Sequence, residues 1–470
     1  MKRRSMDNGH AANGPPGDLA AIDWDAPSGE CAAIAEAWAD IRDLCLDENP
    51  DGLAAVEARL AREWALDIAA AERLVNVNRG LSFRLAINGF DAAGRDAAGA
   101  TDMEQWEVDI LSLLRDVVLW LLDRLDDEPD ERPPLDLDLI LEMHQRLLKL
   151  EQLQSGGERE AAEDGADSTE SLERVIDAIP PPTNEPAPEL VAAWLLHALG
   201  RLRPFGLMSD RVARAVASYS LMAADLFPLT VRREDRNAFA DACAVAHGDG
   251  LASLGGVVAT SQRRSFLLGV STLGRVPAEP DDLTGVLSVI SDQFRTGTSS
   301  MRRNFADAVT VATEVFWHAK ARVAGIESDL IAAIDDGSGE RRAFADYSPP
   351  DHPERRSWHR KQVIDGVRRQ GYFANLRNFS AWNRIGLETP NGRSEILLSF
   401  HAVGQSFRGV VASVLIFYRK RGGQIYDHQV VSREPFQVNF RDTVAGSRRR
   451  FDAWLEPSMR AALEVWRRGE

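Results

Sequence analysis

The sequence is poor in cysteine, and its three cysteines lie far apart with no Cys-x-x-Cys pair (Cys31, Cys45 and Cys243). This spacing speaks against a disulfide framework and against a zinc site. Long apolar runs are also missing, because no uncharged apolar segment reaches the roughly 18 to 20 residues that span a bilayer. The chain begins Met-Lys-Arg-Arg without the apolar run of a signal peptide. We therefore expect a soluble cytoplasmic protein.

The composition is that of an ordinary globular protein with an excess of acidic residues. At 470 residues the chain has room for two or three domains with sizeable cores. Charged residues make up 27% of it and hydrophobic residues 44%, which is typical of folded domains. The formal net charge of −17 argues against general binding of nucleic acid or of a membrane surface. We expect neither as a partner.

Changes in patterning divide the chain into five predicted segments. Residues 1–29 are rich in Gly, Pro, Asn and Asp and are predicted to be a disordered tail. Helical patterns follow in an N-terminal segment (30–100), a central core (101–275) and a connector (276–350). Residues 351–470 add strand-length runs rich in β-branched and aromatic residues before a final amphipathic helix. The predicted fold class is mainly α, with a C-terminal α+β domain.

A pair of buried helices with a short loop between them stands at the centre of the chain. Apolar residues recur at steps of three or four on both sides of the loop (Leu190, Trp194, Ala198 and Leu202 before it; Val212, Val216, Tyr219 and Ala223 after it). Ser209 or Asp210 is a natural N-cap for the second helix. The free N–H groups of that helix would then face the loop, which is an arrangement that binds anions.

The loop sequence Arg203-Pro-Phe-Gly-Leu-Met-Ser-Asp-Arg-Val-Ala-Arg214 resembles the motif of the Fic (Fido) family of nucleotide-dependent protein-modifying enzymes. That motif runs His-Pro-Phe-x-Asp/Glu-Gly-Asn-Gly-Arg-x-x-Arg. The flanking stretches Trp194-Leu-Leu-His197 and Leu226-Phe-Pro-Leu-Thr-Val231 are also similar to the family's. The resemblance implies a Fido-type helical core over residues 101–275.

The residues that would carry Fic chemistry are replaced in this loop. Arg203 stands at the His that accepts the proton of the target hydroxyl, and a guanidinium stays protonated. Leu207 stands at the acidic residue that holds Mg²⁺, which requires oxygen ligands. Met208 and Asp210 replace the two glycines of the phosphate cradle, and Ser209 replaces the Asn between them. We therefore assign no catalytic residue, no metal site and no cofactor.

Two arginines of the motif remain, Arg211 and Arg214, and the resemblance implies a partner for one of them. In many Fic proteins a helix carries Ser/Thr-x-x-x-Glu-Gly/Asn, whose Glu pairs with the second motif Arg and blocks the nucleotide. Ile68-Ala-Ala-Ala-Glu72-Arg73 is similar to that segment but keeps only the Glu. The predicted pair, Glu72 with Arg214, is open to two interpretations: inhibition of the site, or an ordinary salt bridge between helices.

Two further segments concern the binding of a protein target or partner. Fic enzymes carry a β-hairpin flap before the central helices, but residues 155–169 are acidic, have few apolar residues and predict a loop. The stretches Gly371-Tyr-Phe-Ala-Asn-Leu and Ser399-Phe-His401 resemble an extension that follows the core in one bacterial subgroup. The β-rich C-terminal domain is a candidate docking surface for a protein partner.

Two functions follow as alternatives. The first is a Fic-like protein without activity that acts by binding or regulating a protein partner. The second is an enzyme that moves AMP or a phosphoryl group from ATP with Mg²⁺, with Arg203 stabilising charge and another residue as the base. The histidines do not indicate a metal site. His197 is predicted to be a buried core histidine, and His352, His359 and His401 lack metal-site spacing. The oligomeric state is not indicated.

Overall fold

The computed structural model describes residues 24, 29–90, 103–126, 135–155, 166–179, 186–246, 250–273, 299–334, 340–352, 358–390, 392–405, 407–421 and 424–468. The predicted disordered tail lies almost wholly outside these ranges. Within them, no helix is long and apolar enough to cross a bilayer. The described chain is mainly α, with an α+β part at its C-terminal end, as the sequence predicts.

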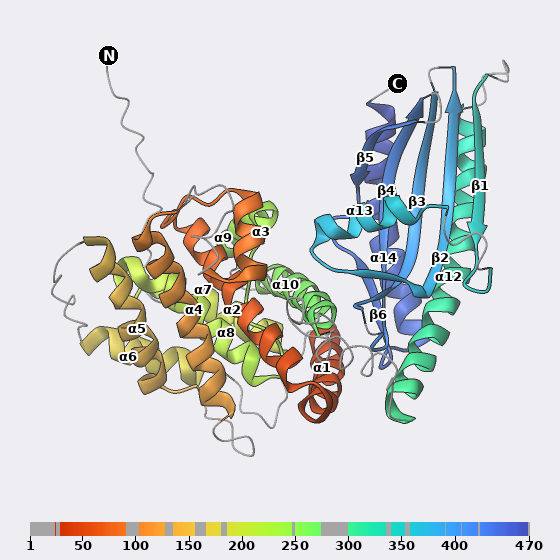
Figure 1. Cartoon of the computed structure of the whole chain (residues 1–470). Coiled ribbons are helices and arrows are strands. Elements are labelled where there is room, and N and C mark those ends of the chain that lie inside the picture. The colour runs from red at the N-terminus through yellow and green to blue at the C-terminus, as the bar shows by residue number, and fades with distance from the viewer. Residues whose placement is uncertain are drawn as a thin grey trace, which may run out of the picture.

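The described residues up to 273 fold as packed helices (Figure 1). These are α1 (Gly29–Glu48), α2 (Pro50–Ala71), α3 (Arg79–Asn88), α4 (Gln105–Asp126), α5 (Leu137–Ser155), α6 (Ala166–Asp177), α7 (Pro188–Leu202), α8 (Ser209–Ala223), α9 (Arg236–Val245) and α10 (Leu251–Thr272). The short 3₁₀ turns η3 (Gly206–Met208) and η4 (Arg233–Asp235) precede α8 and α9. Most of the apolar residues predicted to repeat along α7 and α8 lie in one common core, together with apolar residues of α2, α4 and α5.

Helix α7 is the centre of this core, because it is apolar on nearly every side. It packs against α8, α10, α6 and α1. Helix α10 was not predicted, since its Gly, Ser and Thr content weakens the helical signal. Those small residues allow close packing: a Cβ on Gly255 would lie 2.9 Å from a methyl of Leu190. The helix is thus fixed by its neighbours rather than by its own propensity.

The C-terminal part is built on an antiparallel sheet with helices on both faces (Figure 1). Its strands are β1 (Arg342–Ser348), β2 (Ala374–Thr389), β3 (Gly392–Val403), β4 (Val410–Arg421), β5 (Gln424–Val430) and β6 (Phe436–Asn439). The order is β1-β2-β3-β4-β5, and β6 also pairs with β4. Helices α12 (Ser299–Ile334) and α14 (Val444–Arg467) cover one face, and α13 (Arg360–Gln370) covers the other.

Side chains alternate between the two faces of the sheet, as the period of a strand requires. In β3, Ile396, Leu398 and Phe400 belong to the apolar cluster shared with α12 and α14. Their neighbours Glu395 and His401 are both fully buried on the opposite face. That second face therefore carries buried polar groups, each of which needs a partner.

Several predicted boundaries differ from the structure. Residues 342–348, predicted as part of a helical connector, form the edge strand β1, and α12 packs on the sheet. Residues 166–169 of the predicted loop begin α6, while 156–165 lie outside the described residues. The final helix α14 begins at Val444, because Thr443 caps it by accepting the Gly446 N–H at 3.2 Å.

Candidate functional site: a closed loop between α7 and α8

The loop between α7 and α8 begins with a tight left-handed turn. Helix α7 ends at Leu202, and Arg203 takes φ 49° and ψ 49° while its N–H donates to the Leu199 carbonyl at 3.0 Å. A non-glycine residue in this conformation costs about 1–2 kcal/mol. Gly206 follows with φ 55°, where the absence of a Cβ removes that cost. The chain thereby reverses within four residues and enters η3 and then α8.

The loop side chains separate into packed and exposed ones. Phe205 is buried, as predicted, and its ring centroid lies 4.3 Å from that of His144 on α5. Met208 is buried as well, whereas Leu207 is 82% exposed. Arg203 is also exposed. The two positions where Fic chemistry places a base and a metal ligand therefore hold an exposed guanidinium and an exposed apolar chain.

The start of α8 differs from the predicted anion-binding arrangement. Neither Ser209 nor Asp210 caps the helix: the Ser209 hydroxyl instead accepts the Phe205 N–H at 3.0 Å. The preceding 3₁₀ turn also uses two N–H groups, since those of Met208 and Ser209 donate to the carbonyls of Phe205 and Gly206. Asp210, in the first turn of α8, adds an exposed negative charge at this end. An anion would therefore find fewer free donors here than the sequence suggests.

Glu72 closes over the loop from α2, but its partner is Arg211. The Glu72 carboxylate accepts hydrogen bonds from Arg211 Nε, at 2.8 Å, and from Arg211 Nη2. Arg211 Nη1 contacts the Met208 sulfur at 3.3 Å. The predicted Glu72–Arg214 pair is wrong. Helix α2 ends at Ala71, and the turn there brings Glu72 over the first turn of α8.

Arg214 pairs with Asp67, a residue that the sequence analysis did not select. Its Nη1 lies 3.2 Å from Asp67 Oδ2, and its guanidinium lies 5.1 Å from the ring centroid of Phe239. The two side chains are 12% and 6% exposed. The sequence did hold a signal, because Asp67 lies between Trp64 and Ile68 on the apolar stripe of α2, where a carboxylate requires partners.

Three polar contacts thus run along the antiparallel helices α2 and α8. Glu72 meets Arg211, Asp67 meets Arg214, and Trp64 Nε1 donates to the Ser218 hydroxyl at 3.0 Å. The residues of this series are five and three positions apart on the α2 side and three and four positions apart on α8, which is about one helical turn at each step. The pairing holds both motif arginines against α2.

Asp67 is a hub for the segment that follows α8. Besides Arg214 it accepts the Val231 N–H at 2.7 Å and Arg236 Nη2 at 3.3 Å. Burial raises the pKa of the Asp67 carboxyl above its ordinary value, against the opposing effects of Arg214, the Val231 N–H and Arg236. These contacts therefore offset the free energy that it costs to bury the carboxylate, and removing any one of them would destabilise the fold.

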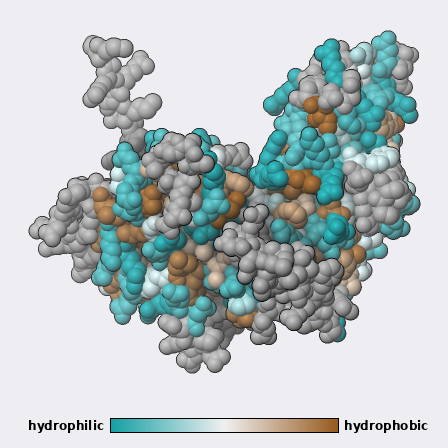
Figure 2. All heavy atoms as spheres, viewed as in Figure 1, coloured by the Kyte–Doolittle hydropathy of each residue, from teal (hydrophilic) through white to brown (hydrophobic). Residues whose placement is uncertain are grey.

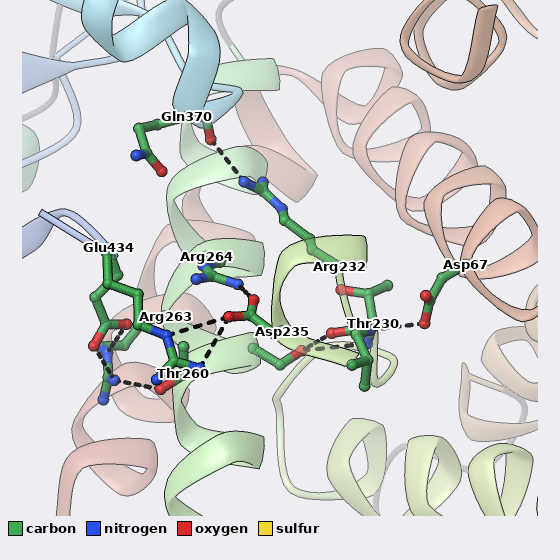
Figure 3. A network of polar contacts seen from close by, with 12 residues as sticks. Asp67, Thr230, Arg232, Asp235, Thr260, Arg263, Arg264, Gln370 and Glu434 are labelled. Carbon is green, nitrogen blue, oxygen red and sulfur yellow. Dashed lines mark hydrogen bonds and ion pairs between the residues drawn. The ribbon is translucent and has the colours of Figure 1, made fainter. Parts of the chain in front are cut away.

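Residues 226–236, here called the strap, tie the helices to the C-terminal part (Figure 3). Thr230 exchanges two hydrogen bonds with Ser261 of α10, at 3.2 and 2.7 Å. Arg232 Nη1 donates to the Gln370 carbonyl at the end of α13, at 3.1 Å. The strap thus contacts α10 on one side and α13 on the other.

Asp235 completes the strap by pairing with two arginines from different parts of the chain. Arg264 of α10 donates to one of its oxygens, and Arg433 from the loop before β6 donates to the other at 3.1 Å. Burial favours the neutral acid, but bonds from Arg264 and Arg433 hold the pKa of Asp235 below its ordinary value. Next to it, Arg263 and Glu434 form an ion pair at 2.7 Å.

A second buried polar cluster lies between the sheet and α13. Glu395 accepts from Tyr418, from Lys420 Nζ at 3.0 Å and from Arg384 Nη1 at 3.2 Å. Although burial opposes ionisation, these donors hold the pKa of Glu395 to about 2. The Tyr418 oxygen also lies 3.0 Å from His359 Nδ1, and burial lowers the pKa of His359 to about 4. The cluster is therefore an ionised carboxylate beside a neutral histidine.

The other histidines do not form a metal site. His197 is half-buried, with its ring centroid 6.4 Å from that of Trp194. His401 is fully buried and lies 2.9 Å from the Tyr372 hydroxyl. Among the residues that the structure describes, no group of three or more His, Cys, Asp or Glu side chains could hold a metal ion. A Mg²⁺ ion of the Fic type does not fit this loop, because Leu207 offers it no oxygen.

Comparisons with known proteins give little support beyond the residues themselves. No family model matches the chain, and no curated protein matches it. A similar solved structure is that of a Fic domain containing signaling protein from Bacteroides thetaiotaomicron VPI-5482, with 13% identity and a TM-score of 0.39. The alignment covers 52% of this chain and 97% of that chain. A likeness at this TM-score establishes neither the fold nor the function of this chain.

Proposed function

We propose that this chain is a Fic-like protein that has lost nucleotide transfer and acts by binding a protein partner. The observation that carries the proposal is that both arginines retained from the motif, Arg211 and Arg214, are paired with carboxylates of α2. A phosphate at the start of α8 would have to displace Glu72 or Asp67. It would also approach Asp210, which repels it by about 1 kcal/mol at 4 Å in water and about 4 kcal/mol near a protein surface.

The remaining loop residues support the same conclusion. Arg203 cannot accept a proton from a hydroxyl, and Leu207 cannot hold Mg²⁺. Transfer of AMP would therefore lack its base, its metal and its phosphate-binding charges. We accordingly propose no cofactor. The alternative is an enzyme that uses ATP and Mg²⁺, with Arg203 stabilising charge and another residue as the base. It requires that ATP and Mg²⁺ bind at this loop.

Labelled ATP separates the two proposals. The full chain is incubated with Mg²⁺ and ATP labelled at the α- or γ-phosphate, alone and with a cell lysate. Each mixture is repeated with Glu72→Ala, which frees Arg211, and with Arg203→Ala, which removes the exposed guanidinium without touching the core. We expect no label on the purified chain, and no label in the lysate mixtures beyond that of the same lysate without the chain.

The controls make the result specific. Circular dichroism and thermal unfolding establish that each variant is folded before it is compared. Label transferred by the natural sequence and lost in Arg203→Ala would overturn the proposal in favour of the enzyme. Label that appears only in Glu72→Ala would also overturn it, because the site would then be inhibited rather than lost.

A further inference from the structure

Positive charge is concentrated at the C-terminal end of an otherwise acidic chain. Residues 341–470 contain 23 Lys and Arg against 13 Asp and Glu, which gives a formal net charge of +10. The whole chain contains 55 basic and 72 acidic residues, so residues 1–340 carry −27. A partner that meets the C-terminal part therefore meets a potential opposite to that of the chain as a whole.

Several basic side chains of the C-terminal part are already paired with carboxylates. Arg384, Arg393 and Lys420 share Glu395, for example. By contrast Arg360, Lys361 and Arg368 are exposed, and none of them forms an ion pair within the described ranges. Helix α13 contains a single acidic residue, Asp365. It therefore presents unneutralised positive charge to solvent.

The packing of α13 fixes where that charge points. Val363, Gly366 and Val367 are buried against the sheet, and a Cβ on Gly366 would lie 3.0 Å from a methyl of Ile416. The helix thus lies directly on β4 and does not roll. Lys361 and Arg368 are seven residues apart, about 10 Å along the helix, on the opposite side from this contact.

Exposed aromatic side chains stand at the two ends of α13. Trp358 is 56% exposed and stacks on Trp382, with ring centroids 6.1 Å apart. Phe373 is 43% exposed, and its N–H donates to the Ser271 hydroxyl at 2.9 Å while its carbonyl accepts the Gly404 N–H at 3.0 Å. The Trp358 ring and the Phe373 backbone are therefore held in place before any partner arrives, which lowers the entropic cost of binding.

We propose that Trp358, Arg360, Lys361, Arg368 and Phe373, here called the α13 face, dock an acidic segment of a protein partner. The carboxylates of that segment would pair with the three basic side chains, and apolar residues near its ends would contact the two rings. The inference rests on the proposed binding function and names the chemistry of the partner.

Figure 2 shows the sheet part as a mainly hydrophilic surface beside a hollow that separates it from the helical part.

The charge distribution favours an acidic peptide over a nucleic acid. Helix α13 is 11 residues long, about 16 Å, and matches a segment of a few acidic residues. A longer nucleic-acid strand would extend past the C-terminal part to the helical part and be repelled there, because residues 1–340 carry a net charge of −27. At physiological salt, charges interact over about 8 Å, so a short segment senses the local positive charge and not the net −17.

Fluorescence anisotropy tests this with the full chain and a labelled 12-residue peptide that contains Asp, Glu and two Leu. The test variant is Arg360→Glu/Lys361→Glu/Arg368→Glu. Its matched control, Arg460→Glu/Arg467→Glu/Arg468→Glu, makes a similar charge change on α14, where the three side chains are at least 70% exposed. We expect the test variant to bind at least about tenfold more weakly than the control, and Trp358→Ala to weaken binding about three- to tenfold.

Specific outcomes would overturn the inference. These are the absence of peptide binding, equal binding by the test and control variants, or tighter binding of a 12-nucleotide oligothymidylate. Binding that does not weaken when salt rises from 50 to 300 mM would also do so. The labelled-ATP assay on the same preparations keeps the two claims separate: transferred label refutes the proposed function while peptide binding still supports the α13 face.

Discussion

Replacing Asp67 with Asn tests whether α2 holds the loop as the contacts imply. The amide keeps the size of the side chain but removes its charge. Arg214 and Arg236 would then lose a carboxylate at 3.2 and 3.3 Å, while the Val231 N–H could still donate to the amide oxygen. Breaking a buried ion pair costs about 3–5 kcal/mol. Because Asn also removes the burial cost of the carboxylate itself, we expect a loss of about 2–3 kcal/mol.

Urea unfolding measures this loss as a change in midpoint at constant slope. Asp40→Asn is the matched control, because Asp40 pairs with Arg441 at 2.6 Å at the surface, with side chains 35% and 46% exposed. Exposed pairs contribute about 0–1 kcal/mol. A double-mutant cycle of Asp67→Asn with Arg214→Met should give a coupling of about 1–2 kcal/mol. A loss below about 1 kcal/mol for Asp67→Asn, or no coupling, would refute the reasoning.

Three further predictions concern stability. The pKa of about 2 for Glu395 lies below its ordinary 4.5, so the stability that the ionised carboxylate contributes is complete above pH 4.5 and is lost as pH falls toward 2. The shift corresponds to about 3 kcal/mol of unfolding free energy, which partial screening reduces to about 1–2 kcal/mol. The difference in unfolding free energy between the natural sequence and Glu395→Gln should therefore shrink between pH 6 and pH 3. Ser218→Ala leaves Trp64 Nε1 and the Leu229 N–H without their acceptor and should cost about 2–4 kcal/mol in urea unfolding, whereas a near-neutral result would exclude these bonds. A Cβ on Gly386 would lie 2.1 Å from the Phe344 ring, so Gly386→Ala should lower the unfolding free energy by about 1–3 kcal/mol. Adding Phe344→Leu to that variant should restore part of the loss. If Gly386→Ala alone kept full stability, the packing of Gly386 on Phe344 would be contradicted.

The helical periodicity was sufficient to predict the elements that build the site. Most of the apolar residues predicted to repeat along α7 and α8 lie in the core, and the predicted C-terminal segment contains the strands β2 to β6. Periodicity depends only on local spacing, so it succeeds where one face of an element is buried.

Other features depend on contacts that the sequence does not display. Strand β2 is interrupted by the polar residues Arg377 and Asn378 at a shift in its register, which hides its alternation. The partner of Glu72 is set by where α2 ends, and a shift of one turn along α8 changes it from Arg214 to Arg211. Asp67 is the clearest omission, because a carboxylate between Trp64 and Ile68 on the buried side of α2 requires partners.

Isothermal titration calorimetry with ATP and Mg²⁺ measures whether the loop between α7 and α8 binds a nucleotide. The titration uses the full chain and, in parallel, Glu72→Ala. We predict no saturable heat for either protein, corresponding to a dissociation constant weaker than about 1 mM. Saturable 1:1 binding by the natural sequence, dependent on Mg²⁺ and abolished by Arg203→Ala, would contradict the account.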